Sequence, residues 1–148
     1  MNVMRLVAAM ALGYGLAGCA GTLDPRAGHP AEHPSGPDGA WCGTPDATGP
    51  VYVEIHYAGD GTPSAVPDTC TVDPGTDITW RGPPGELIAF EIVFPGESPA
   101  LHGERAQLRS SVIDGHSRVR IKASDKPGSY KYGIKANDIE VDPAIIIR

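Results

Sequence analysis

Residues 127–148 constrain the fold more than any other part of the chain, because they combine a turn, an alternating strand and an unbroken apolar run. Pro127-Gly128 predicts the turn, and large apolar residues at 130, 132 and 134 alternate with smaller or charged ones, as in a half-buried strand. After a short polar loop, residues 144–147 run apolar without a break, which is typical of a strand covered on both faces. The chain is therefore predicted to end in two strands joined by a polar loop.

Similar patterns predict short strands through the rest of the domain. The predicted strands cover residues 51–57, 69–72, 77–81 and 88–94. Residues 64–67 are interpreted as loop, and Asp114-Gly115-His116 predicts the turn of a hairpin between 110–113 and 117–123. About eight short strands with no convincing long helix predict an all-β fold, a two-sheet antiparallel sandwich with Greek-key connections.

The first 18 residues read as a leader peptide. Arg5 begins a short charged region, and residues 6–16 are an apolar run too short to span a bilayer. Leu16-Ala17-Gly18-Cys19 resembles the bacterial lipobox, in which the cysteine is acylated and becomes the mature N-terminus. This resemblance implies cleavage after residue 18 and a lipid anchor on Cys19, with palmitate as an expected acyl chain. A secretory signal peptide with a chance cysteine is the alternative.

The predicted cellular location is the bacterial cell envelope. Ala20 and Gly21 follow the cysteine, and the absence of an aspartate there resembles Gram-negative lipoproteins of the outer membrane, which face the periplasm. A formal net charge of −6 favours solubility and argues against nucleic acid as a partner.

Residues 19–40 are predicted to be a flexible tether, and residues 41–148 the folded domain. The tether is rich in Pro, Gly, Ala and Asp and has too few large apolar residues to offset the entropy of ordering. His29 and His33 lie four residues apart within it, but Pro30 and Pro34 argue against the helix that would pair them on a metal. They are interpreted as solvated linker histidines.

Two cysteines remain once Cys19 is assigned to the lipid. Cys42 and Cys70 form an even pair in an oxidising compartment, which predicts a disulfide. A redox-active pair is the alternative, although the Cys-x-x-Cys spacing that would support it is absent.

The strand, loop and strand at the end of the chain resemble the end of the cupredoxins, the plastocyanin-like copper proteins. The segment from Val72 to Trp80, with its Asp73-Pro74-Gly75 turn into an apolar strand, and the Gly-x-Tyr-x-Tyr pattern of residues 128–132 are also similar to the family. The resemblance covers residues 51–148 and implies a cupredoxin-like sandwich. An immunoglobulin-like sandwich, which can carry similar patterns, is the alternative.

The same resemblance implies that the copper site of the family is absent here. A blue-copper site needs two histidines, a cysteine thiolate and a weak axial ligand. The corresponding positions of this chain hold Phe90, Ile134, Asn137 and Asp142. Phe90 and Ile134 are therefore expected to fill the core, and neither a cofactor nor a bound metal is expected.

The chain shows no catalytic motif. Asp114, His116 and Ser117 are an acid, a base and a hydroxyl, but neighbouring residues in a tight turn point apart, and triad members usually converge from distant segments. A nucleophile elbow, a His-Glu-x-x-His motif and a phosphate loop are all absent from the sequence. We therefore expect a protein that is not an enzyme.

Five cations could form a docking face if two predicted strands pair. Antiparallel pairing of residues 117–123 with residues 129–135 would place five basic residues on one solvent face: Arg118, Arg120, Lys122, Lys131 and Lys135. This face would suit an anionic envelope component or an acidic protein patch, unless neighbouring acids neutralise it.

Three functions are compatible with these patterns. The first is a membrane-anchored periplasmic lipoprotein with a non-copper, cupredoxin-like binding or interaction domain. The second is a small inhibitor or immunity lipoprotein directed against a hydrolase, which rests on analogy of class alone. The third is a metal carrier with nonstandard ligands.

Overall fold

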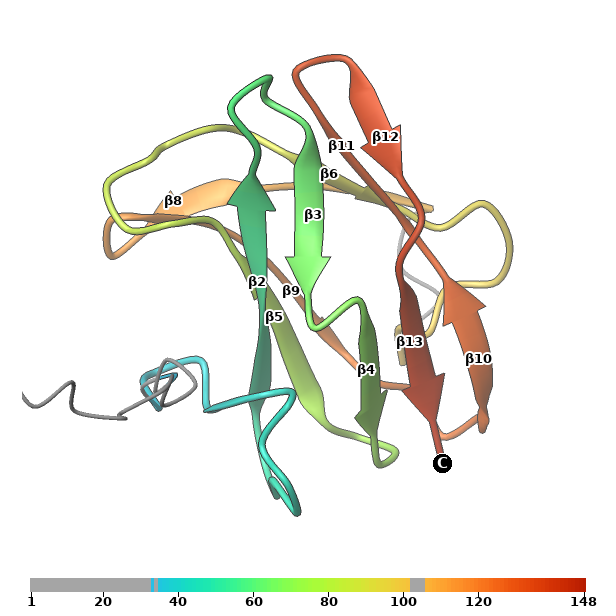
Figure 1. Cartoon of the computed structure of the whole chain (residues 1–148). Helices are drawn as coiled ribbons and strands as arrows, with labels where there is room; N and C mark the ends of the chain where they lie inside the picture. Colours follow the sequence, from blue (N-terminus) through green and yellow to red (C-terminus); the bar gives the residue numbers. More distant parts are fainter. Residues whose placement is uncertain (1–32, 34, 102–105) are drawn as a thin grey trace, which may run out of the picture. The chain divides into compact units, whose positions relative to one another are not determined.

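The computed structural model describes residues 33, 35–101 and 106–148, so the predicted leader, Cys19 and His29 lie outside the described residues. This part of the chain consists of strands and loops (Figure 1). Its strands are β1 (Ala40–Trp41), β2 (Val51–Tyr57), β3 (Pro63–Val66), β4 (Thr69–Val72), β5 (Asp77–Arg81), β6 (Glu91–Val93), β7 (Gln107–Arg109), β8 (Ser111–Ile113), β9 (His116–Lys122), β10 (Gly128–Lys131), β11 (Gly133–Ala136), β12 (Ile139–Val141) and β13 (Ala144–Ile147). The described residues contain no helix that could cross a membrane.

One layer is a six-stranded sheet. Its strands follow the order β1-β2-β5-β9-β8, and β3 pairs with β2 beside β1. β2 pairs with β5 along one edge. Along its other edge it pairs with β1 at Val51 and Tyr52, and with β3 from Glu54 to Tyr57.

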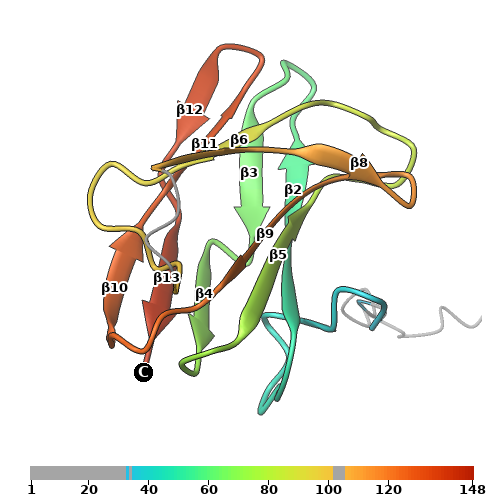
Figure 2. The same cartoon turned by 180° about the vertical axis from the view of Figure 1, so that it is seen from behind.

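The other layer is built from two smaller sheets that lie end to end. β10 and β11 are separated by Tyr132 alone and continue in one direction, as do β13 and β12 on the partner side (Figures 1 and 2). The sheet orders are β10-β13-β4 and β12-β11-β6-β7. The amide of Tyr132 donates to the carbonyl of Pro143 at 3.1 Å, so hydrogen bonding continues across the junction.

The core lies between the two layers because most strands turn their apolar side inward, whereas all three residues of β8 are exposed. Trp80 on β5 is fully buried, and its ring meets those of Phe94 and Tyr132 with centroids 6.4 and 5.2 Å away. Such edge-to-face pairs are favourable beyond the apolar area that they bury. Ile78, Ile92, Ile134 and Ile145 complete the centre of this core, each with no exposed surface.

The all-β, two-sheet sandwich that the sequence predicts is confirmed, and several elements match closely. β2, β4 and β5 have the predicted bounds, and β8 and β9 form the predicted hairpin. Asp114 and Gly115 in its turn have φ of 48° and 75°, the left-handed pair that a type I′ turn requires.

Three local predictions are wrong. The polar loop predicted before residues 144–147 contains β12, which pairs with β11. Residues 64–67, predicted as loop, contribute most of β3. This strand pairs with β2, and its first residue, Pro63, lies opposite Tyr57.

The strand predicted over residues 88–94 is shortened to β6, with Phe90 and Phe94 buried just outside it. Both residues still bond to the segment around β7, since the amide of Phe94 donates to the carbonyl of Ala106 at 2.7 Å and the amide of Ser110 donates to the carbonyl of Phe90 at 2.8 Å. Apolar alternation therefore extends beyond the regular strand, although hydrogen bonding does not stop at its ends.

The pairing is mixed rather than antiparallel throughout. β2 runs parallel to β1 and β5, and β4 runs parallel to β13. Parallel neighbours need a crossover connection, and the chain crosses through β3 and β4 between β2 and β5. The mixed pairing is therefore a consequence of the crossed connections between the layers.

The predicted disulfide is present. Cys42 follows β1 directly and is bonded to Cys70 in β4, with the two Cα atoms 5.7 Å apart. The bond joins the start of the domain to a strand of the opposite layer, because β1 belongs to the six-stranded sheet and β4 to the three-stranded sheet.

Candidate functional site

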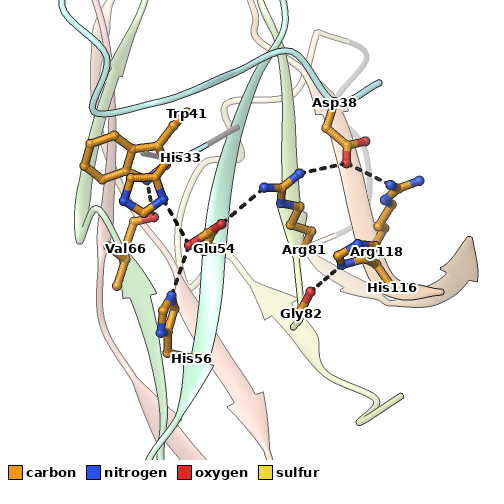
Figure 3. A network of polar contacts seen from close by, with 10 residues as sticks. All are labelled: His33, Asp38, Trp41, Glu54, His56, Val66, Arg81, Gly82, His116 and Arg118. Carbon is orange, nitrogen blue, oxygen red and sulfur yellow. Dashed lines mark hydrogen bonds and ion pairs between the residues drawn. The ribbon is translucent and has the colours of Figure 1, made fainter. Parts of the chain in front are cut away.

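The candidate site lies on the outer face of the six-stranded sheet. Alternation along β2 turns Val53 and Ile55 into the core and Tyr52, Glu54 and His56 to the outside. On the neighbouring strands, Arg81 of β5 and Arg118 of β9 stand opposite one another in the register. Polar side chains from three adjacent strands therefore meet on one face (Figure 3).

Glu54 is the centre of one half of this network. Its Oε1 accepts a hydrogen bond from Arg81 at 3.2 Å, and its Oε2 accepts one from His56 Nε2 at 3.2 Å. His33 Nδ1 lies 3.3 Å from the same Oε2. Burial alone would raise the pKa of the Glu54 carboxyl, but hydrogen bonds from His56 and Arg81, with the charges of His33 and Arg81, lower it below its ordinary value.

Two arginines and one aspartate form the other half. Asp38 Oδ2 lies 3.0 Å from Arg118 and 3.9 Å from Arg81, and the side chains of all three residues are about nine-tenths buried. Arg118 also donates to Asp114 Oδ2 at 3.2 Å, and the guanidinium of Arg81 stacks 3.5 Å above the ring of Tyr52. Each arginine is therefore held by a second group as well as by Asp38, whose contacts with both arginines Figure 3 shows.

A tight turn presents Asp38 to these arginines. The backbone amides and carbonyls of Gly36 and Gly39 bond reciprocally at 3.1 and 2.9 Å, which leaves Pro37 and Asp38 at the tip. Gly39 has a φ of 92°, and a Cβ atom there would lie 1.7 Å from the carbonyl oxygen of Pro50. Glycine is therefore required for the turn to approach the sheet.

We call residues 33 and 35–41 the strap. The sequence predicts a flexible tether that ends at residue 40, but the strap contacts the folded domain before that point. The ring of His33 stacks on Trp41 at 4.0 Å, and Trp41 donates from Nε1 to the carbonyl of Val66 at 3.1 Å. The interpretation of His33 as a solvated linker residue is wrong, because ion pairs and ring stacking hold a segment that has little apolar area to bury.

A pocket of about 380 Å³ borders the network. Its walls come from β2, from the start of the loop after β5, and from the beginning of β9. Its lining includes Glu54, His56, Arg81, Pro83, Pro84 and His116. The loop wall is held in place because His116 Nδ1 donates to the carbonyl of Gly82 at 2.7 Å. The pocket thus combines an apolar proline wall with a carboxylate, a guanidinium and two imidazoles.

The four positions that correspond to copper ligands are divided between core and surface. Phe90 and Ile134 are buried at 1% and 0% exposure. Asn137 is exposed, has a φ of 50°, and donates from Nδ2 to the carbonyl of Gly61 at 3.3 Å. Asp142 is exposed. Within residues 33, 35–101 and 106–148, no group of three or more His, Cys, Asp or Glu side chains could hold a metal ion.

The predicted five-cation face does not form. β9, which carries Arg118, Arg120 and Lys122, pairs with β5 and β8 in one layer. β10 and β11, which carry Lys131 and Lys135, pair with β13, β12 and β6 in the other. The turn after β9 crosses between layers instead of closing a hairpin.

Two of the three β9 cations are also neutralised. Arg118 is buried against Asp38 and Asp114, and Arg120 lies 3.3 Å from Asp77. Arg118 and Arg120 therefore contribute to ion pairs within the domain rather than to a free basic ladder.

Sequence reasoning missed the ionic network, although its parts carried signals. The outward positions of β2, Tyr52, Glu54 and His56, were recognisable from alternation. The Gly36-Pro37-Asp38-Gly39 sequence is a turn signal inside the predicted tether. What the sequence does not reveal is that this turn folds back onto Arg81 and Arg118.

Comparison with known proteins gives structural neighbours only. The chain matches no protein-family model, and no curated protein sequence is similar to it. Among solved structures it resembles the reduced Cu(I) form of an amicyanin mutant at pH 4, with 16% identity, a TM-score of 0.43, and coverage of 69% of this chain and 85% of amicyanin.

It also resembles a Cu-containing nitrite reductase from Thermus scotoductus, with 16% identity, a TM-score of 0.43, and coverage of 69% of this chain but 23% of that enzyme. Rusticyanin from Thiobacillus ferrooxidans follows with 15% identity, a TM-score of 0.36, and coverage of 66% and 77%. The strand order and pairings make the described domain a two-layer β-sandwich. TM-scores below 0.5 add no argument to the cupredoxin-like fold that the sequence resemblance implies.

Proposed function

We propose that the chain is a lipid-anchored protein of the bacterial cell envelope, and that its β domain is a non-catalytic binding module. The sequence Leu16-Ala17-Gly18-Cys19 supports the anchor, through its resemblance to the lipobox. The pocket beside Glu54 and Arg81 supports the binding role.

One observation carries the binding role: a pocket and a buried ionic network occupy the same outer sheet face. Charges that only keep a sheet face soluble can stay in water, where they cost little. Removing Asp38, Arg81 and Arg118 from water carries a large desolvation penalty. A face that fixes charged groups at a pocket is suited to recognise a polar partner, such as a periplasmic protein or an anionic component of the envelope.

The anchor is tested by changing Cys19→Ser. The variant is expected to remain uncleaved or to leave the membrane fraction, whereas the unchanged chain fractionates with membranes through its N-terminus. A mature Cys19→Ser protein that still fractionates with membranes would contradict the anchor.

The binding role is tested with a photo-cross-linking residue placed at Pro84, which is exposed and lines the pocket. The matched control carries the same residue at Asp125, which is also exposed but does not line this pocket. Irradiation of intact cells is expected to give a discrete adduct from position 84 only. Adducts of equal yield from both positions, or none from position 84, would contradict a binding role for this pocket.

A further inference from the structure

The arrangement of Arg81 and Arg118 resembles a filled anion-binding site. Both guanidinium groups approach the same oxygen, Asp38 Oδ2 (Figure 3). Each is also oriented by partners outside the strap: Glu54 and the ring of Tyr52 hold Arg81, and Asp114 in the β8–β9 turn holds Arg118. The arginines are therefore positioned by groups that do not belong to the strap.

Asp38 fills this site incompletely. Its Oδ2 is buried and makes no hydrogen bond of good geometry, although Arg118 lies 3.0 Å away, and the buried Nε of Arg118 has no hydrogen-bond partner among the described residues. The distance of 3.9 Å to Arg81 is also long for a charge-assisted hydrogen bond, which spans about 2.7–2.9 Å. A free carboxylate, which is not restrained by a turn, could engage these donors with better alignment.

The local charges select the class of anion. Without Asp38, the two arginines face two carboxylates, those of Glu54 and Asp114, so the site is close to neutral. One negative charge is then tolerated, as Asp38 itself demonstrates, but a second would be repelled by both carboxylates. A carboxylate therefore suits the site better than a phosphate dianion.

We propose that Arg81 and Arg118 form a carboxylate-binding site, which Asp38 of the strap occupies in the free protein. A carboxylate of a peptide partner replaces Asp38, and the pocket beside Arg81 receives the neighbouring part of that partner. This inference deepens the proposed binding role. Because the disulfide fixes Cys42 and β1 pairs with β2, displacement is confined to the strap residues before β1 and leaves the sandwich intact.

Occupation by Asp38 lowers the apparent affinity for any external carboxylate. The external group binds only the fraction of molecules in which the strap has opened, so its dissociation constant is divided by that fraction. Removing the charge of Asp38 should therefore strengthen binding, which is opposite to the effect of removing an ordinary ligand-binding residue.

The test compares the full-length chain with its Asp38→Asn variant, using sodium acetate as the probe at constant ionic strength against chloride. The resonances of the arginine Nε–H groups are followed by NMR. Asp38→Asn is expected to give saturable shifts at Arg81 and Arg118, with an affinity at least about tenfold above that of the unchanged chain. Asp125→Asn, which removes an exposed charge elsewhere, is expected to match the unchanged chain.

Two further arms keep the proposal falsifiable. If circular dichroism shows that Asp38→Asn is unfolded, Trp41→Ala replaces it, because this change loosens the strap by removing the stack with His33 while Asp38 and both arginines remain. The absence of saturable acetate shifts in the folded variant overturns the proposal. Tighter binding of inorganic phosphate than of acetate overturns the assignment to carboxylates.

The source of the carboxylate is distinguished with two capped peptides. One is acetyl-Ala-Ala-Ala with a free C-terminus, and the other is acetyl-Ala-Asp-Ala-amide. Preference for the first identifies a chain terminus, and preference for the second an acidic side chain. Failure of the acetate experiment alongside a specific adduct from position 84 would remove the carboxylate site but keep the binding role.

Discussion

The disulfide between Cys42 and Cys70 should supply a large part of the stability of the β domain. Its cysteines are 28 residues apart in sequence, and in the chain-entropy description a loop of this length contributes about 3.6 kcal/mol. For a domain of this size, that corresponds to a fall in Tm of about 15–20 °C on reduction. The loss matters because whole domains are stable by only about 5–15 kcal/mol.

Guanidinium unfolding, followed through the fluorescence of buried Trp80, measures this contribution in oxidised and reduced protein. Reduced protein keeps both sulfur atoms and isolates the cross-link. The Cys42→Ala and Cys70→Ala double variant also loses packing at the buried position 70, and should be less stable by roughly a further 1 kcal/mol. Reduced protein within about 1 kcal/mol of the oxidised form would refute the loop-closure argument.

Three other predictions address the core, the pH response and copper. Ile134→Ala should lower the free energy of unfolding by about 2–5 kcal/mol, because this side chain is fully buried. Asp142→Ala, at an exposed position that also corresponds to a copper ligand, should change it by less than about 0.5 kcal/mol. Denaturant unfolding measures both values. The lowered pKa of Glu54 means that its ionised form stabilises the fold above its ordinary pKa of 4.5, so the stability difference from Glu54→Gln should shrink as pH falls below that value in an acid titration of unfolding. Added Cu(II) should give no intense thiolate-to-copper absorption with the mature protein. Phe90 and Ile134 occupy two of the ligand positions, Cys42 and Cys70 are joined in the disulfide, and Cys19 is acylated in the proposed mature form; a blue product would contradict this.

The strands that the sequence predicts well are those in which burial and hydrogen bonding coincide. β2 and β5 alternate cleanly, and the Asp114-Gly115 turn defines its hairpin by backbone conformation. β3 was missed because prolines at 63 and 67 bracket a short run of small residues, and Pro63 is tolerated as the first residue of a strand that pairs along one side. Periodicity reports which side of a strand is buried, but not where its ladder ends.

The site was hidden for a different reason. The prediction of a flexible tether rests on apolar burial. The strap is instead held by ion pairs and a hydrogen bond to residues far along the chain, by a ring stack within the strap, and by the disulfide at Cys42 next to it. The crossing after β9 was equally invisible, because the turn that joins β9 to β10 has the composition of a hairpin turn. Sequence spacing therefore gave the wrong neighbours for Lys131 and Lys135.

The place of β13 in its sheet has a consequence for how the domain is made. β13 is the middle strand between β10 and β4, although β4 precedes it by about seventy residues of chain. During synthesis, β4 and β10 emerge without the strand that joins them, and their edges stay open until residues 144–147 arrive. Sequence-distant pairing of this kind slows folding, since the loop must close before its contacts are gained. The edge of β4 therefore stays unpaired for about half of the synthesis of the chain, and such open edges are prone to aggregation.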